Sequence, residues 1–350
     1  MEKTTHSSKK ILCFGELLLR MSPHMQGEWI QQHHMPTYVG GAELNVATAL
    51  AKWEIPVKYV SAIPDHSLSY DLLSYLGGKN IDMSSMLLSG NRIGLYFLPQ
   101  GSDLKNAGVI YDRAYSSFSE LQPGDLPWGE ILEDVCWVHF SAISPALNEN
   151  VTAVCLELLQ VASQKDIPIS IDLNYRAKLW KYGKNPAGVM SELLPYCDLV
   201  MGNIWAAEKL LGIPLDNALI QHNVKESYLE HAYLTSKAIQ RAYPKVKKVA
   251  NTFRFDASEN DILYYATFCT PEEWRVSKEF KAQGIKDKIG SGDCFMAGLL
   301  YGLSHSFDLD KVLQFAASAA VGKMYETSDA TDQTVASILL TEALFTRQHA

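Results

Sequence analysis

Short apolar runs alternate with segments of helical periodicity along most of the chain. Five of these runs have the length of buried strands: ILCFG (11–15), VKYVSAI (57–63), VCWVHFS (135–141), IPISIDLN (167–174) and DLVMGN (198–203). Apolar strands that alternate with helices are typical of βαβ units, in which helices cover both faces of a parallel sheet. The pattern therefore predicts an α/β fold with a mostly parallel central sheet flanked by helices.

The segment between the third and fourth runs has a clear helical period. Its apolar residues, at relative positions 0, 3, 4, 7 and 11, are Val151, Val154, Cys155, Leu158 and Ala162. This spacing places all of them on one face of a helix. We expect that face to cover the sheet.

Polar side chains follow several of the predicted strands. Glu16 follows the first run, Asp172 and Asn174 end the fourth, and Asn203 ends the fifth. In an open parallel sheet, ligands bind at the edge formed by the carboxyl ends of the strands. We therefore expect the functional site at this edge.

Two stretches depart from the alternation of strands and helices. RIGLYFLPQ (92–100) and AGVIYDRAY (107–115) are separated by a polar segment and predict a β-hairpin, which EWIQQHHMPTYVG (28–40) extends. The prediction is one α/β domain over residues 10–345. A small β lid is formed from about residues 20–38 and 92–118.

Composition narrows the class of protein. The 350 residues include 31 Lys and Arg against 39 Asp and Glu, and the net charge of −8 disfavours a nucleic-acid partner. The six cysteines form no close pair, so neither a zinc ribbon nor a disulfide framework is expected. The polar first ten residues suggest no signal peptide, and no apolar run is long enough for a membrane span. The simplest expectation is a cytoplasmic protein without a membrane partner.

The segment IGSGDCFMAGLLYGL (289–303) carries the strongest chemical signal. Gly290 and Gly292 flank Ser291 and allow a tight turn with converging backbone N–H groups, and a helix of apolar period follows at once. A helix N-terminus of this kind binds an anion, and Asp293 in its first turn is placed to accept a proton. The alternative is an ordinary loop with Asp293 as a helix cap.

The segment GGAELNVATAL (40–50) is the second signal. Gly40 and Gly41 leave room for a ligand against the backbone, and Asn45 stands among small apolar residues on the helix that follows. Asn45 offers a ligand both a donor and an acceptor. The alternative is close helix packing in which Asn45 caps the backbone.

Read together, the two segments resemble the two signatures of the ribokinase-like, or PfkB, carbohydrate kinases. The resemblance covers nearly the whole chain, with Asn203 between the two segments in the order and spacing of the family. It implies that Asp293 is the catalytic base. It also implies an anion hole formed by the amides of Gly290, Ser291 and Gly292. The residues it assigns to the sugar are Gly40, Gly41 and Asn45.

Within the family, four further stretches resemble 2-keto-3-deoxygluconate kinases. They are CFGELLLRMSP (13–23), RIGLYFLPQG (92–101), VIYDRAYSSFS (109–119) and DLNYRAKLW (172–180). The positions that match contacts to the acid sugar in those enzymes are Tyr96, Tyr111, Arg113 and Arg176.

Two arginines in one pocket suit a carboxylate, because each guanidinium makes forked, charge-assisted hydrogen bonds to it. The alternative is that both form salt bridges with acidic neighbours, Arg113 with Asp112 and Arg176 with Asp172.

The resemblance to the family implies ATP and Mg²⁺ as cofactors, but it fails at several nucleotide positions. Ala206 stands where the family has a glutamate three residues after Asn203, and Lys288 and Ile289 replace threonines that often accompany a monovalent-cation site. No residue is assigned as a metal ligand. A variant of the nucleotide-covering stretch is present. The residues implied to contact the nucleotide are Asn203, Thr252, Arg254 and Ser258.

The preferred hypothesis is an ATP-dependent kinase that phosphorylates 2-keto-3-deoxygluconate. Its alternatives are a fructokinase or another sugar kinase of the family, and a non-catalytic sugar-binding protein of the same fold. A dinucleotide oxidoreductase ranks last, because only one glycine, Gly15, follows the first strand. Lids of this kind often pair between subunits in the family, so a homodimer is expected.

Overall fold

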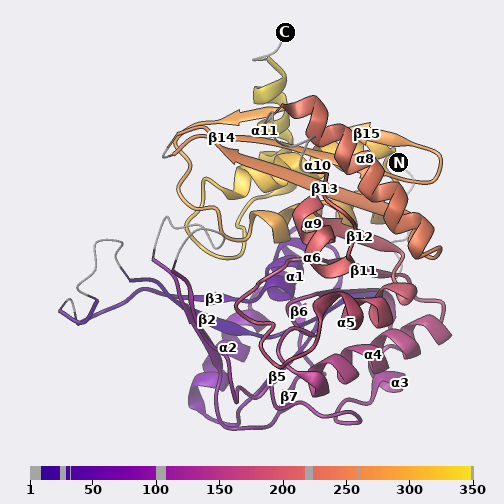
Figure 1. Cartoon of the computed structure of the whole chain (residues 1–350). Coiled ribbons are helices and arrows are strands. Elements are labelled where there is room, and N and C mark those ends of the chain that lie inside the picture. The colour runs from indigo at the N-terminus through magenta and orange to yellow at the C-terminus, as the bar shows by residue number, and fades with distance from the viewer. Residues whose placement is uncertain are drawn as a thin grey trace, which may run out of the picture.

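The computed structural model describes residues 9–23, 29–31, 33–99, 108–216, 224–258 and 260–347. Its centre is a ten-stranded sheet (Figure 1). From one edge to the other, the strands are β15 (Trp274–Val276), β14 (Ile262–Cys269), β13 (Lys248–Asp256), β12 (Leu199–Gly202), β11 (Ile169–Asp172), β10 (Val135–Ser141), β1 (Lys10–Phe14), β4 (Val57–Val60) and β6 (Ile81–Asp82). From β6 to β13 all neighbours are parallel. β14, β15 and β16 (Phe280–Ala282) add antiparallel pairs.

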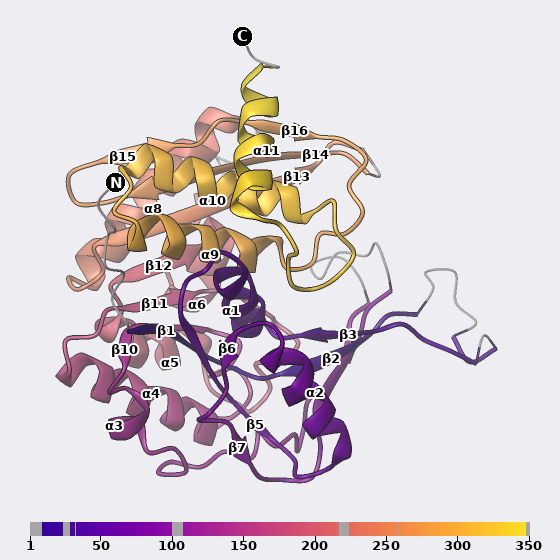
Figure 2. The same ribbon diagram turned by 180° about the vertical axis from the view of Figure 1, so that it is seen from behind.

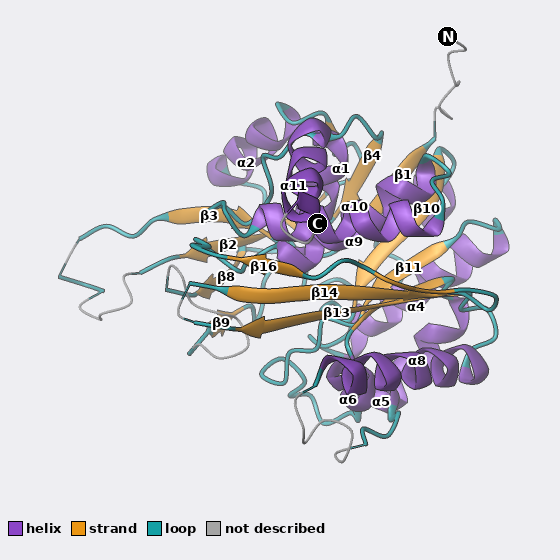
Figure 3. Cartoon of the chain, turned by 90° about the horizontal axis from the view of Figure 1, so that it is seen from above, coloured by secondary structure: helices purple, strands orange, loops and turns teal. Residues whose placement is uncertain are grey.

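Helices cover both faces of this sheet (Figure 3). One layer consists of α1 (Ala42–Lys52), α2 (Ser67–Gly77), α9 (Ser291–Ser304), α10 (Leu309–Lys323) and α11 (Val335–Arg347). The other consists of α3 (Trp128–Ile131), α4 (Glu149–Gln164), α5 (Pro186–Leu193), the 3₁₀ turn η1 (Leu194–Tyr196), α6 (Ile204–Leu211) and α8 (Lys225–Ala242). The predicted α/β fold is thereby confirmed.

Alternate side chains of a strand point to opposite faces of the sheet and pack into two separate apolar cores. On β1, Ile11 and Cys13 belong to the core under α1 and α9, while Leu12 and Phe14 belong to the core under α4. The apolar face predicted for α4 is buried as expected.

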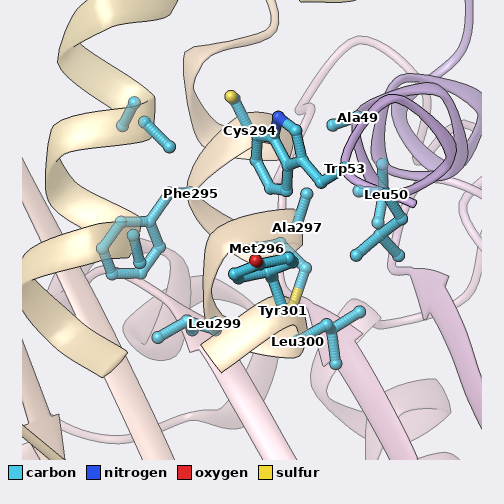
Figure 4. Packing of buried hydrophobic residues seen from close by; sticks show 14 of the residues in the cluster. Ala49, Leu50, Trp53, Cys294, Phe295, Met296, Ala297, Leu299, Leu300 and Tyr301 are labelled. Carbon is cyan, nitrogen blue, oxygen red and sulfur yellow. The ribbon is translucent and has the colours of Figure 1, made fainter. Parts of the chain in front are cut away.

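Close helix packing fixes the position of α9. Trp53 and the α1 residues before it pack against Met296, Ala297 and Leu300 of α9 (Figure 4). On its other side α9 lies against α10, and a Cβ on Gly298 would come within 2.6 Å of Ala316 Cα. Interiors packed this tightly transmit strain rather than deform. The first turn of α9 is therefore held rigidly.

A second, four-stranded sheet projects from the side of the domain (Figures 1 and 2). Its order is β3 (Thr37–Gly40), β2 (Leu18–Met21), β8 (Gly94–Phe97) and β9 (Ile110–Asp112). β8 and β9 form the expected antiparallel pair, and β2 joins β8 in parallel. Parts of the predicted lid, residues 24–28, 32 and 100–107, lie outside the described residues. A short two-stranded sheet pairs β5 (Ala62–Ile63) with β7 (Leu87–Leu88).

Candidate active site

A cavity of about 540 Å³ opens where the carboxyl ends of the parallel strands meet the small sheet. Most of the residues singled out in the sequence line it: Gly41, Asn45, Tyr96, Tyr111, Arg113, Arg176, Asn203, Thr252, Arg254, Gly290, Ser291, Gly292 and Asp293. Two do not. Gly40 packs against Asp329, and Ser258 is exposed on the turn between β13 and β14.

The turn before α9 depends on Gly290. This residue caps the helix with φ 73°, and a Cβ on it would lie 2.0 Å from the carbonyl oxygen of Asp329. Only glycine meets both demands. Ser291 Oγ donates to the carbonyl of Lys288 at 2.9 Å, and Asp287 Oδ1 accepts from the amide of Ile289 at 3.0 Å. The backbone amides of the first turn have no acceptor inside the helix and lie at the cavity, where a helix N-terminus can hold an anion.

Gly292 has a different environment. The nearest atom to a Cβ built there is Met201 Cε, at 3.8 Å, so the protein itself leaves room for a side chain. Gly292 lines the cavity. A side chain at this position would occupy space in front of the helix N-terminus.

Asp293 is bound by a residue of the other sequence segment. Asn45 Nδ2 donates to Asp293 Oδ2 at 2.7 Å. Burial raises the pKa of Asp293 to about 8, the hydrogen bond from Asn45 opposes the rise, and the charges of Asp172 and Glu43 add to it. A carboxyl group with a pKa near the working pH is suited to take a proton and return it.

The second polar atom of the Asn45 side chain is available to a ligand. Asn45 Oδ1 is buried and has no hydrogen-bond partner among the described residues. An unsatisfied buried acceptor is costly, and native sites of this kind are commonly completed by a ligand or water. Asn45 therefore holds Asp293 through its amide N–H, and its oxygen can accept a hydrogen bond from a ligand.

The small sheet contributes two aromatic rings to the cavity. Tyr96 of β8 and Tyr111 of β9 are cross-strand partners with ring centroids 6.4 Å apart. Tyr96 Oη donates to Asp329 Oδ2 at 2.5 Å, so this hydroxyl proton is already engaged within the protein. Tyr96 therefore offers a ligand its ring and its oxygen lone pairs.

Arg113 has a salt-bridge partner that the sequence analysis did not identify. Both its Nε and its Nη2 lie 2.5 Å from Glu16 Oε2, and Ser116 Oγ donates to Glu16 Oε1. Asp112, its neighbour in sequence, pairs instead with Arg92 at 2.6 Å. The Glu16 pair is buried, yet Arg113 still lines the cavity.

Arg176 reaches the same cavity from the loop after β11. Its Nη1 donates to the carbonyl of Tyr175 at 3.1 Å, and its charge acts to lower the pKa of Asp293. The structure thus brings Arg113 and Arg176 to one cavity together with Asp293.

The nucleotide residues implied by the sequence lie at the β12 and β13 side of the cavity. Asn203 caps α6, its Oδ1 accepting from the amide of Ala206 at 2.9 Å. Thr252 Oγ1 donates to the carbonyl of Gly202 at 3.4 Å, and Arg254 Nη1 donates to Ser291 Oγ at 3.3 Å. Arg254 therefore lies beside the N-terminus of α9.

Lys288 also lines the cavity. In the sequence it was noted only because it replaces a threonine that the family often has at this position. Its Nζ lies 2.5 Å from Asp256 Oδ1, at the β13 side of the cavity. The sequence signal for it was a basic residue next to a glycine turn. Lys288 and Arg254 are basic residues on this side of the cavity, and Asp256 balances the charge of Lys288.

The residues of the cavity do not form a metal site of their own. In the described part of the chain, no three His, Cys, Asp or Glu side chains are grouped as metal ligands. Ala206 carries no oxygen, and the Asn203 oxygen is used for capping. Mg²⁺ usually keeps several waters and binds through nucleotide phosphates with one or two carboxylates. Nucleotide phosphates would therefore hold the Mg²⁺, without a grouped set of ligands from the described residues.

A known protein family matches most of the chain. Residues 8–333 match the family described as pfkB family carbohydrate kinase. The crystal structure of a 2-dehydro-3-deoxygluconokinase from Thermotoga maritima is 30% identical and superposes with a TM-score of 0.86, covering 96% of this chain and 99% of that one. A fructokinase from Xylella fastidiosa with bound ATP shares the fold, with a TM-score of 0.75 at 18% identity over 98% of this chain and 100% of that one.

Two curated relatives add sequence similarity. A 2-dehydro-3-deoxygalactonokinase from Haloferax volcanii is 33% identical over 172 residues, which span 49% of this chain and 54% of that enzyme. The match thus spans about half the length of that relative. A 5-dehydro-2-deoxygluconokinase from Geobacillus thermodenitrificans is 24% identical over 81% of this chain and 77% of its own length. None of the helices in the described ranges is long and apolar enough to cross a membrane.

Proposed function

Because the chain belongs to the pfkB family of carbohydrate kinases, we propose that it transfers the γ-phosphoryl group of ATP to a hydroxyl of 2-keto-3-deoxygluconate. One observation carries the choice of substrate: Arg113 and Arg176 line the same cavity as Asp293. A neutral sugar has no group that uses two guanidinium ions in this way. The similarity to a deoxygluconokinase over nearly the full chain supports the same choice.

The proposed transfer needs one base and one anion site. Asp293 takes the proton of the sugar hydroxyl, and the hydroxyl oxygen attacks the γ-phosphorus. The bond from phosphorus to the bridging oxygen breaks, and ADP leaves. The amides at Gly290, Ser291 and Gly292 and the N-terminus of α9 hold the transferring group while its charge is redistributed. Mg²⁺, held by the phosphates, would supply charge neutralisation.

Each end of the sugar acid has a proposed contact. The carboxylate lies between Arg113 and Arg176, and Asn45 Oδ1 accepts from a hydroxyl near the reacting one. Tyr96 and Tyr111 cover the sugar from the small sheet and keep water from the phosphoryl group. We propose that this sheet, which was expected from about residues 20–38 and 92–118 and in which β2 begins at Leu18 and β3 ends at Gly40, acts as a lid.

The nucleotide lies on the opposite side of Asp293. We propose that Asn203, Thr252 and Arg254 border it, since all three line the cavity beyond the anion site. Lys288, paired with Asp256, lies on the same side of the cavity. Ser258, which the family resemblance implied as a nucleotide contact, does not line the cavity and is not included in this proposal.

An ATP-consumption assay across several sugars tests the proposal. The set is 2-keto-3-deoxygluconate, its galactonate epimer, 5-dehydro-2-deoxygluconate, gluconate, fructose and ribose. The proposal expects the largest kcat/KM with 2-keto-3-deoxygluconate. Preference for fructose would favour the fructokinase alternative, and a protein that binds sugar without consuming ATP would favour the non-catalytic one.

A further inference from the structure

A group of charged side chains is buried behind the turn at Gly290, on the side away from the cavity. We call it the buried charge cluster, and it consists of Arg20, Asp287, Lys323, Glu326 and Asp329. Arg20, Asp287, Lys323 and Asp329 are almost fully inaccessible to solvent. Burying so many charges is costly unless they compensate one another.

Arg20 compensates part of the negative charge. Its Nε donates to Asp329 Oδ1 at 2.7 Å, and its Nη1 lies 3.5 Å from Asp287 Oδ2. Its Nη2 donates to the carbonyl of Thr327 at 3.0 Å. One guanidinium therefore faces two carboxylates, and Glu326 brings a third.

Lys323 supplies the second positive charge. Its Nζ is buried and makes no hydrogen bond to any described residue, and the same holds for Asp287 Oδ2 and Glu326 Oε2. Burial raises the pKa of Asp287 and of Glu326, and the charge of Lys323 opposes both rises. The ammonium thus acts electrostatically on both carboxyl groups without a hydrogen bond to either.

Lys323 also lies directly behind the anion site. Its Cε is 3.3 Å from the position that a Cβ on Gly290 would take. Three carboxylates behind an anion site repel the group that the site must hold, and charges act over longer distances in a buried region than in water. Lys323 carries a positive charge and lies close to the turn, so it offsets that repulsion.

We propose that Lys323 is a positioning residue whose fixed ammonium offsets the buried carboxylates, so that the turn at Gly290 presents a positive potential to the transferring phosphoryl group. The inference rests on the proposed kinase activity. It implies that turnover needs no added monovalent cation, because the protein carries its own.

Lys323→Met and Lys323→Ala test the proposal. Lys323→Met keeps most of the volume and removes the charge, and it should lower kcat roughly tenfold to a hundredfold while KM for the sugar stays within about twofold. Lys323→Ala opens space under Gly290, and potassium or ammonium should recover its kcat at least severalfold at constant ionic strength. Tetramethylammonium, which is too large, should not. Met324→Ala, a neighbouring buried truncation without loss of charge, should show no such recovery.

A charge-compensating double variant separates electrostatics from packing. Adding Glu326→Gln to Lys323→Met removes one carboxylate and should restore part of the lost kcat. The proposal would be contradicted if the kcat of the double variant were no higher than that of Lys323→Met.

Two further results would also contradict the proposal. One is a folded Lys323→Met enzyme with the wild-type kcat. The other needs no variant: wild-type turnover that rises severalfold on adding potassium. A wild type with no turnover on any sugar would instead contradict the proposed function, so the two failures are distinguishable.

Discussion

Asn45 donates a 2.7 Å hydrogen bond to Asp293, joining α1 to α9 across 248 positions of sequence. The bond links the two segments that the sequence analysis had singled out separately. It orients the carboxyl group whose pKa burial raises to about 8. The proposed reaction depends on this pair, because a base must be oriented and must have a pKa close to the working pH.

Asp293→Asn should lower kcat by roughly 10² to 10⁴, the usual contribution of a positioned general base. ATP binding should be retained, because the anion site consists of backbone amides. Titration with ATP and steady-state kinetics on the purified variant check both points. Near wild-type turnover by the variant would exclude Asp293 as the base.

The same substitution should change stability in a pH-dependent way. The pKa of Asp293 is about 8 when folded and near its ordinary value of 3.8 when unfolded. Between these values the folded state binds more protons, so its contribution to stability falls as pH rises. The melting temperature of Asp293→Asn relative to wild type should therefore rise from pH 4 to pH 8. A constant difference across this range would contradict the raised pKa.

The pH dependence of catalysis should follow the same group. Because the base must be deprotonated, kcat/KM of the wild type should climb about tenfold per pH unit and level off near pH 8. The low rate of Asp293→Asn should lack this dependence. A wild-type profile that is flat from pH 6 to pH 9 would mean that another group takes the proton.

Gly290 and Gly292 should respond differently to valine. Gly290→Val meets a positive φ and the Asp329 carbonyl, so the variant should unfold at a clearly lower temperature or fail to fold. Gly292→Val has room within the protein and should fold, but kcat should fall more than a hundredfold because the side chain blocks the anion site. Thermal melts and kinetics separate the two effects. Normal kcat in Gly292→Val would show that phosphoryl transfer occurs elsewhere.

Glu16 should matter mainly for stability. Glu16→Gln leaves the buried Arg113 guanidinium without its counter-charge, and the free energy of unfolding should fall by about 3 kcal/mol or more. Asp112→Asn is a matched control, since it disrupts the more exposed pair with Arg92 and should cost less than about 1 kcal/mol. Chemical denaturation measures both. Equal losses would mean that the Glu16 pair is not a buried structural contact.

The sequence was sufficient for the fold and for the turn at Gly290, because both depend on local patterns. Apolar runs of strand length predicted the sheet, and the glycines with the following apolar period predicted the turn that starts α9. The glycines that allow a turn are close together in the sequence, so the turn can be predicted without knowledge of tertiary contacts.

The partner of Arg113 could not be found in that way. Asp112 is adjacent in sequence, but β-strand neighbours point to opposite faces, and Asp112 meets Arg92 while Arg113 meets Glu16 from a segment 97 positions away. The buried charge cluster is likewise assembled from distant segments. Such contacts depend on tertiary packing, which no local pattern contains.

We propose that this kinase recognises a sugar acid through Arg113 and Arg176, and the variant Arg176→Ala is the sharpest test of that recognition. A hydrogen bond to a charged group contributes about 1.5–3 kcal/mol, so kcat/KM for 2-keto-3-deoxygluconate should fall roughly tenfold to over a hundredfold. The value for fructose, measured on the same preparations, should change far less, and Arg176→Lys should recover little of the loss. Equal losses for both sugars, or a wild type that prefers fructose, would contradict the claim.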